Sequence, residues 1–85
     1  MVQFEYTIKE EMGLHARPAG VMVKQLKPLS CNITISCGSR SADAKKMFAL
    51  MATAVKCGET VTVTIDGENE EAIKDELLTF FSENF

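Results

Sequence analysis

The chain changes from one repeating pattern to another within the stretch Gly13-Leu14-His15-Ala16-Arg17-Pro18-Ala19-Gly20. Before it, residues 2–9 alternate apolar and polar side chains, which is the period of a strand with one buried face. After it, apolar residues recur at helical spacing from 16 to about 27, where a proline ends the helix. Pro18 fits the first turn of that helix, because a missing N–H loses no intrahelical bond there. The stretch therefore predicts a strand-to-helix junction with His15 at or just before the helix start.

The strand and helix patterns recur along the rest of the chain. Alternating segments and a Gly-Ser hairpin signal predict three more strands, which span residues 31–37, 40–42 and 60–66. Apolar residues at helical spacing predict two more helices, from about 46 to 54 and from 70 to about 82. The shorter helix is expected to carry Ala54 on its apolar stripe, with Gly58 just past its end. Because each strand has one polar side, we expect an antiparallel sheet covered on one face, which is an α+β open-faced sandwich.

Length and composition predict a single domain over residues 1–85 and argue against several functions. A chain of 85 residues with 46% hydrophobic side chains can bury one core and is expected to fold on its own. Its formal net charge of −3 argues against nucleic-acid binding, which needs a basic surface. No uncharged stretch approaches the roughly 20 apolar residues of a membrane span, and residues 1–6 lack the pattern of a secretory signal. We therefore expect a cytoplasmic protein without direct membrane contact, and a monomer by default.

The metal-ligating residue types are too few and too scattered for a metal site or a disulfide framework. The three cysteines, Cys31, Cys37 and Cys57, form no C-x-x-C pair, and the chain holds one histidine. We expect buried or half-buried free thiols in a reducing compartment, and neither a metal nor another cofactor.

The one histidine lies where a helix is expected to begin, and such a place suits an anion. The free N–H groups and positive dipole end of a helix start favour negative charge, and Arg17 adds a planar cation suited to phosphate oxygens. An imidazole is largely neutral near pH 7 and can attack phosphorus to form a phosphohistidine. Without paired carboxylates or a Ser-His-Asp set, His15 has no partners for a complete catalytic cycle, so a carrier is expected rather than a stand-alone enzyme. The alternative for a lone histidine at such a junction is a helix cap or a surface residue.

The segment Gly13-Leu14-His15-Ala16-Arg17-Pro18-Ala19 resembles the phosphorylation-site motif of HPr, the histidine-containing phosphocarrier family of the bacterial sugar phosphotransferase system. The resemblance also covers the chain length, the order of elements and the segment Gly58-Glu59-Thr60-Val61 before the last strand. It implies four antiparallel strands with three helices on one face. It further implies that His15 accepts a phosphoryl group on Nδ1 from phospho-enzyme I, which took it from phosphoenolpyruvate, and passes it to IIA domains of sugar permeases. Arg17 and the backbone N–H groups at the helix start, including that of Ala16, would hold the phosphoryl group.

The resemblance also implies a surface that docks these partners. Met47, Phe48 and Met51 stand where the family presents an apolar patch, although Met47 and Met51 also fit a core position. Phe48 lies off the apolar stripe, and an exposed Phe with adaptable Met neighbours suits a surface that docks several partners in turn. Lys24 and Lys27 are candidates to meet acidic partner surfaces, and the alternative is a solvated helix face.

The chain departs from the family pattern at three positions. Many members carry a serine where this chain has Lys46, and phosphorylation of that serine regulates them; lysine cannot be phosphorylated in this way. The family serine also caps the helix that follows, and Asp43 is a candidate to replace that cap in this chain. Met12 replaces a small polar neighbour of the histidine, and Gly20 replaces a larger residue. These departures favour a specialised paralogue that serves fewer partners over the general carrier of its cell. The alternative to a carrier of either kind is a regulatory binding module whose phosphorylation state at His15 a partner senses. A structural module with an inert histidine is the third reading.

Overall fold

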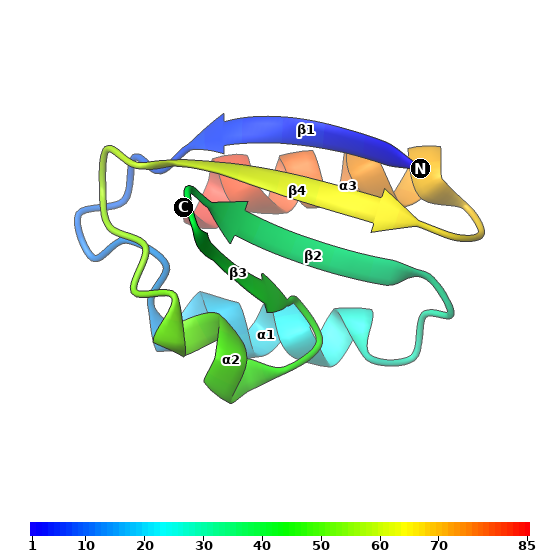
Figure 1. Cartoon of the computed structure of the whole chain (residues 1–85), viewed down its shortest axis with the longest axis horizontal. Coiled ribbons are helices and arrows are strands. Elements are labelled where there is room, and N and C mark those ends of the chain that lie inside the picture. The colour runs from blue at the N-terminus through cyan, green and yellow to red at the C-terminus, as the bar shows by residue number, and fades with distance from the viewer.

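The structure is a computed structural model that describes residues 1–85. Four strands and three helices follow one another along the chain (Figure 1). They are β1 (Val2–Thr7), α1 (Ala16–Leu26), β2 (Asn32–Cys37), β3 (Arg40–Asp43), α2 (Met47–Ala52), β4 (Thr60–Asp66) and α3 (Glu70–Asn84). The predicted order is confirmed, and the predicted bounds differ from these by a few residues at the element ends.

The strands form one antiparallel sheet in the order β1-β4-β2-β3. The last strand in sequence, β4, therefore lies inside the sheet, between β1 and β2 (Figure 1). In the register, Val63 of β4 lies opposite Phe4 of β1 and Ile35 of β2, and all three side chains are buried. Because strand side chains alternate between faces, this register places the apolar residues of three strands on one face. The predicted α+β open-faced sandwich, with three helices against one face of a four-stranded sheet, is confirmed.

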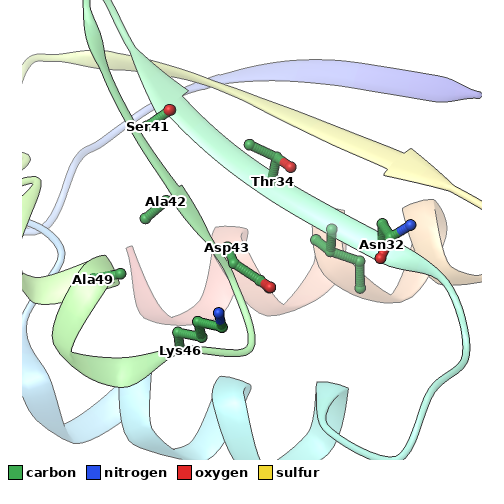
Figure 2. Close-up of a pocket in the computed structure, with 8 residues that line it drawn as sticks. Asn32, Thr34, Ser41, Ala42, Asp43, Lys46 and Ala49 are labelled. Atoms are coloured by element: carbon green, nitrogen blue, oxygen red, sulfur yellow. The ribbon is translucent and has the colours of Figure 1, made fainter.

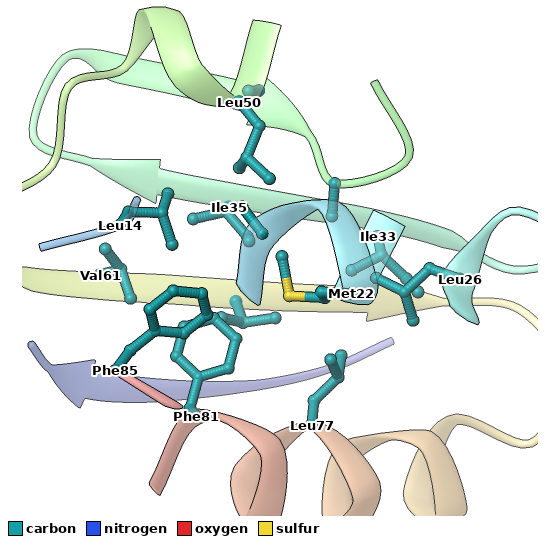
Figure 3. Packing of buried hydrophobic residues seen from close by; sticks show 14 of the residues in the cluster. Leu14, Met22, Leu26, Ile33, Ile35, Leu50, Val61, Leu77, Phe81 and Phe85 are labelled. Atoms are coloured by element: carbon teal, nitrogen blue, oxygen red, sulfur yellow. The ribbon is translucent and has the colours of Figure 1, made fainter. Parts of the chain in front are cut away.

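The hydrophobic core lies between the sheet and the helices and contains 22 buried residues (Figure 3). Phe81 of α3 is fully buried, and its ring meets those of Phe4 and Tyr6 of β1 edge-on, at centroid distances of 6.0 and 5.5 Å. Helix α1 contributes Met22, which is 1% exposed, and burial of one such side chain stabilises the fold by about 1.5–3 kcal/mol. Burial of Met22 fixes α1 on the sheet, whereas the first two residues of α1, Ala16 and Arg17, are exposed.

Helix α2 ends earlier than its sequence pattern predicts. Its last residue is Ala52, whereas Ala54 is exposed and has a left-handed backbone, with φ of 50°. The Ala54 N–H still donates to the Met51 carbonyl, at 3.1 Å. Ala54 thus occupies the position after the helix cap where glycine is usual, and Gly58 does not end the helix. The expectation that Ala54 belongs to the apolar stripe was wrong, because the spacing of apolar residues does not predict where the backbone turns left-handed.

None of the three helices combines the length and the apolar character that a membrane span requires.

Replacement of Ala54 by glycine is expected to stabilise the protein. A left-handed backbone costs a residue with a Cβ about 1–2 kcal/mol, and the extra freedom of glycine in the unfolded chain takes back part of the gain. We expect Ala54→Gly to raise the free energy of unfolding by about 0.5–1 kcal/mol in urea titrations. Ala52→Gly is the matched control, because it places glycine at the last helical residue and should lower the same quantity by up to about 1 kcal/mol. A loss of stability in Ala54→Gly would contradict the strained-backbone account.

Candidate functional site

His15 occupies the N-cap position of α1, directly before the first helical residue. Its backbone is extended, with φ of −96° and ψ of 164°, and its carbonyl oxygen accepts the bond from the Ala19 N–H, at 3.2 Å. The imidazole is half-buried and makes no side-chain hydrogen bond to the helix end. Pro18 is the third helical residue, inside the first turn, as the sequence predicts. The predicted placement of His15 at the helix start is therefore confirmed. Its ring nitrogens do not cap the helix.

The start of α1 carries unpaired backbone donors. The N–H groups of Ala16 and Arg17 donate to no carbonyl or side chain of the protein, and Pro18 has no N–H. The first turn contains no acidic side chain that would offset the positive end of the helix dipole. Two free donors beside His15 can therefore bind the oxygens of an anion.

A surface hollow of about 360 Å³ lies over this helix start. It is lined by Met12, His15, Ala16 and Arg17. Arg17 is exposed and has no carboxylate within ion-pairing distance, so its guanidinium is available to an incoming anion. Met12 is 70% exposed and offers the hollow an apolar wall. His15, Ala16 and Arg17 are thus brought together as the sequence predicts.

The loop before His15 is packed closely against the loop that follows α2. Gly13 has φ of +68°, and a Cβ built on it would lie 2.4 Å from the Val55 carbonyl oxygen and 2.8 Å from Lys56 Cα. The same Val55 oxygen accepts a hydrogen bond from the Leu14 N–H, at 3.0 Å. Only glycine fits this contact, because any larger residue would push the two loops apart. The position of His15 therefore depends on the loop at residues 53–59.

A cluster around Arg40 holds that second loop in place. The Arg40 guanidinium donates to the Thr53 carbonyl oxygen at 2.9 Å, to the Glu59 carboxylate, and to Cys37 Sγ at 3.2 Å. The other oxygen of Glu59 accepts a hydrogen bond from the Lys56 N–H, at 2.8 Å. The hydrogen bond from Arg40, with a further contribution from the Lys56 N–H, holds the pKa of Glu59 below its ordinary value. The sequence gives no signal for this cluster beyond Glu59 in the segment before β4.

The five predicted docking residues differ in exposure. Phe48 is 93% exposed, whereas Met47 and Met51 are half-buried and pack against the core. Lys24 and Lys27 are exposed on α1.

A hollow of about 810 Å³ brings together three lysines and the start of α2; its lining residues are Lys27, Asp43, Lys45, Lys46, Met47, Phe48 and Ala49. Met51 and Lys24 do not line it. A Cβ on Gly20 would lie 3.9 Å from Met47 Cε, an ordinary van der Waals distance, so the packing of α1 on α2 does not require glycine there.

Lys46 is the N-cap residue of α2, and its side chain makes no capping hydrogen bond. Asp43 Oδ1 accepts a hydrogen bond from the Lys45 N–H, at 2.9 Å, so Asp43 caps the turn before the helix rather than the helix itself. Lys46 and Asp43 both line a further hollow of about 480 Å³, whose other lining residues come from β2, β3 and α2. Figure 2 shows the side chains of Lys46 and Asp43 near each other. The expectation that Asp43 replaces the N-cap side chain of α2 is therefore met only in part, because its hydrogen bond lies in the turn before the helix.

The remaining titratable residues form no second centre. No group of three histidine, cysteine, aspartate or glutamate side chains lies close enough to hold a metal ion. Cys31 and Cys37 are buried free thiols, as expected, but Cys57 is exposed, because it lies in the loop at residues 53–59 outside the core. Phe85 was not among the predicted site residues, although its ring centroid lies 6.4 Å from that of the His15 imidazole. In the sequence, only the four-residue spacing from Phe81 indicates that Phe85 lies on the same helix face.

Together, the fold and the site define a small open-faced sandwich that presents a histidine and an arginine at an anion-binding helix start. A family model described as the PTS HPr component phosphorylation site matches residues 2–83. The chain belongs to the HPr family, the phosphocarriers of the phosphotransferase system.

Relatives and solved structures agree with this membership. The chain is 41% identical over 66 residues to the phosphocarrier protein HPr of Haemophilus influenzae, covering 78% of each chain. It is 37% identical over 71 residues to the HPr of Mycoplasma capricolum, covering 84% of this chain and 80% of the relative. The crystal structure of HPr-C-His from Thermoanaerobacter tengcongensis superposes with a TM-score of 0.88 at 28% identity, covering 96% of this chain and 92% of that one.

Proposed function

We propose that the protein is a phosphocarrier in which His15 accepts a phosphoryl group on Nδ1 and passes it to a second protein. The observation that carries the proposal is the unpaired start of α1, where the Ala16 and Arg17 N–H groups and the Arg17 guanidinium stand beside the one histidine of the chain. The donor is phospho-enzyme I and the acceptors are IIA domains of sugar permeases, in the cytoplasm. The carrier works as a monomer and needs no cofactor of its own.

The residues at the site match the steps of such a transfer. The lone pair of the neutral imidazole attacks phosphorus, the new N–P bond forms, and the electron pair of the broken bond stays with the donor. The phosphoryl group then carries negative charge close to the first turn of α1, where two N–H groups and the helix dipole oppose it. Arg17 can present two parallel N–H donors to phosphate oxygens, which an ammonium group cannot. Donation to the acceptor is the reverse reaction, with a second protein in place of the donor.

The surface around α2 supports the docking part of the proposal. Phe48 exposes nearly all of its ring beside Met47, and lysines 27 and 46 border the same hollow. An apolar centre with a basic rim is complementary to a partner surface that is apolar with acidic neighbours. Lys46 has no hydroxyl, so phosphorylation at this position cannot regulate docking in this chain.

Loss of the imidazole is expected to abolish phosphoryl transfer without unfolding the protein. Intact-protein mass spectrometry after incubation with enzyme I, magnesium and phosphoenolpyruvate should show one acid-labile phosphate on the unsubstituted chain and none on His15→Ala. Addition of a IIA domain should then remove it. The fold should persist, because the His15 side chain is half-buried and makes no hydrogen bond to the helix end.

Three results would contradict the proposal. Phosphate on His15→Ala would place the acceptor elsewhere. Phosphate that stays after the IIA domain is added would favour the regulatory binding module over the carrier. Absence of phosphate on the unsubstituted chain would show that enzyme I does not phosphorylate His15.

Truncation of Phe48 is expected to weaken docking and leave stability unchanged. An aromatic anchor at the centre of an interface typically contributes 2 kcal/mol or more, so Phe48→Ala should raise the KM of enzyme I for the carrier by about thirtyfold or more. The urea midpoint should not move, because the side chain is 93% exposed. Glu5→Ala, an exposed position on β1, is the control and should leave the KM unchanged. An unaltered KM in Phe48→Ala would remove this residue from the docking surface.

A further inference from the structure

The imidazole of His15 has an aromatic neighbour but no hydrogen-bond partner within the chain. No hydrogen bond or ion pair within the chain joins the side chain of His15 to another group, and the ring is only half-buried. Its aromatic neighbour is Phe85, at a centroid distance of 6.4 Å and an interplanar angle of 86°. This is the edge-to-face arrangement that aromatic pairs prefer, within the usual range of about 4.5–7 Å. Phe85 is therefore the group that can restrict rotation of the imidazole.

Phe85 is itself firmly placed. Its side chain is 3% exposed, and its ring packs against those of Phe81 and Phe80, at centroid distances of 5.1 and 6.0 Å. Its carbonyl oxygen accepts hydrogen bonds from the Lys9 and Glu10 N–H groups, at 2.6 and 2.7 Å. Figure 3 shows the rings of Phe85 and Phe81 side by side within the core. The ring that meets His15 is thus fixed both by α3 and by the loop that leads toward the site.

We propose that Phe85 is a positioning residue for His15, and this inference rests on the proposed phosphocarrier function. The Phe85 ring limits the imidazole to one orientation at the start of α1. The ring nitrogen then meets the incoming phosphorus without a prior search among rotamers, which is how a preorganised group gains rate. Phe85 does not touch the phosphoryl group. It acts through His15.

The phenylalanines of α3 offer a matched pair of variants. Phe85→Leu keeps an apolar side chain but removes the ring that faces His15. Phe80→Leu removes a ring that contacts Phe85 and does not contact His15, so it controls for loss of aromatic packing. Phe85→Tyr keeps the ring and serves as the conservative rescue.

Nuclear magnetic resonance reads the position of the imidazole without any partner protein. Because the chain holds one histidine, its ring protons are assigned without ambiguity. We expect nuclear Overhauser contacts between the His15 and Phe85 rings in the unsubstituted chain. We also expect His15 ring-proton shifts that move toward free-histidine values in Phe85→Leu and stay in place in Phe80→Leu and Phe85→Tyr. Absence of the contacts, or equal shift changes in Phe85→Leu and Phe80→Leu, would overturn the inference even if Phe85→Leu folds poorly.

The rate of phosphoryl transfer gives the functional half of the test. With phospho-enzyme I as donor, Phe85→Leu should lower kcat about 2- to 10-fold, which is the factor that corresponds to the coupling of one aromatic pair. Phe80→Leu and Phe85→Tyr should transfer at the unsubstituted rate. Equal rates in Phe85→Leu and the unsubstituted chain would overturn the inference. If the unsubstituted chain accepts no phosphate, the proposed function fails, and the resonance experiment still decides whether Phe85 orients His15.

Discussion

The contact of Gly13 and Leu14 with the carbonyl oxygen of Val55 is the constraint on which the site depends. It joins the loop that precedes α1 to the loop that follows α2, at a distance that leaves no room for a Cβ on residue 13. A second link supports it, because the Ile8 N–H donates to the Glu59 carbonyl oxygen and the Gly58 N–H donates to the Ile8 carbonyl oxygen, at 2.9 and 2.8 Å. The Arg40 cluster holds the second loop from its other side. The direction in which the chain enters α1 is thereby fixed before any ligand arrives.

Helix α1 packs on the core through its buried face and carries the site at its first two residues. Met22 and Leu26 of α1 are buried in the core, so the later turns of the helix are anchored by packing. Ala16 and Arg17 at the start of the helix are exposed, and their unpaired N–H groups keep their capacity to bind an anion. A rigid scaffold with an unsatisfied end is what a carrier needs, because the donors must be in place both when the phosphoryl group arrives and when it leaves.

Local signals in the sequence predicted most of the fold, and long-range contacts account for what they missed. Alternation located the strands, and Pro18 with the change of period located His15 at the helix start. The end of α2 was placed too late, since Ala54 is apolar in pattern but left-handed in backbone. The Arg40–Glu59 pair and the His15–Phe85 contact join residues far apart in the chain. No periodicity reports such pairs, because they arise only when the sheet brings distant loops together.

The central claim is that the free N–H groups at the start of α1 hold the phosphoryl group on His15. The most direct measurement compares amide proton–nitrogen spectra of the protein before and after phosphorylation. The account predicts that the largest changes fall on the Ala16 and Arg17 amides, whose protons move downfield as they begin to donate to phosphoryl oxygens. Unchanged Ala16 and Arg17 amides in a protein that carries the phosphate would contradict it.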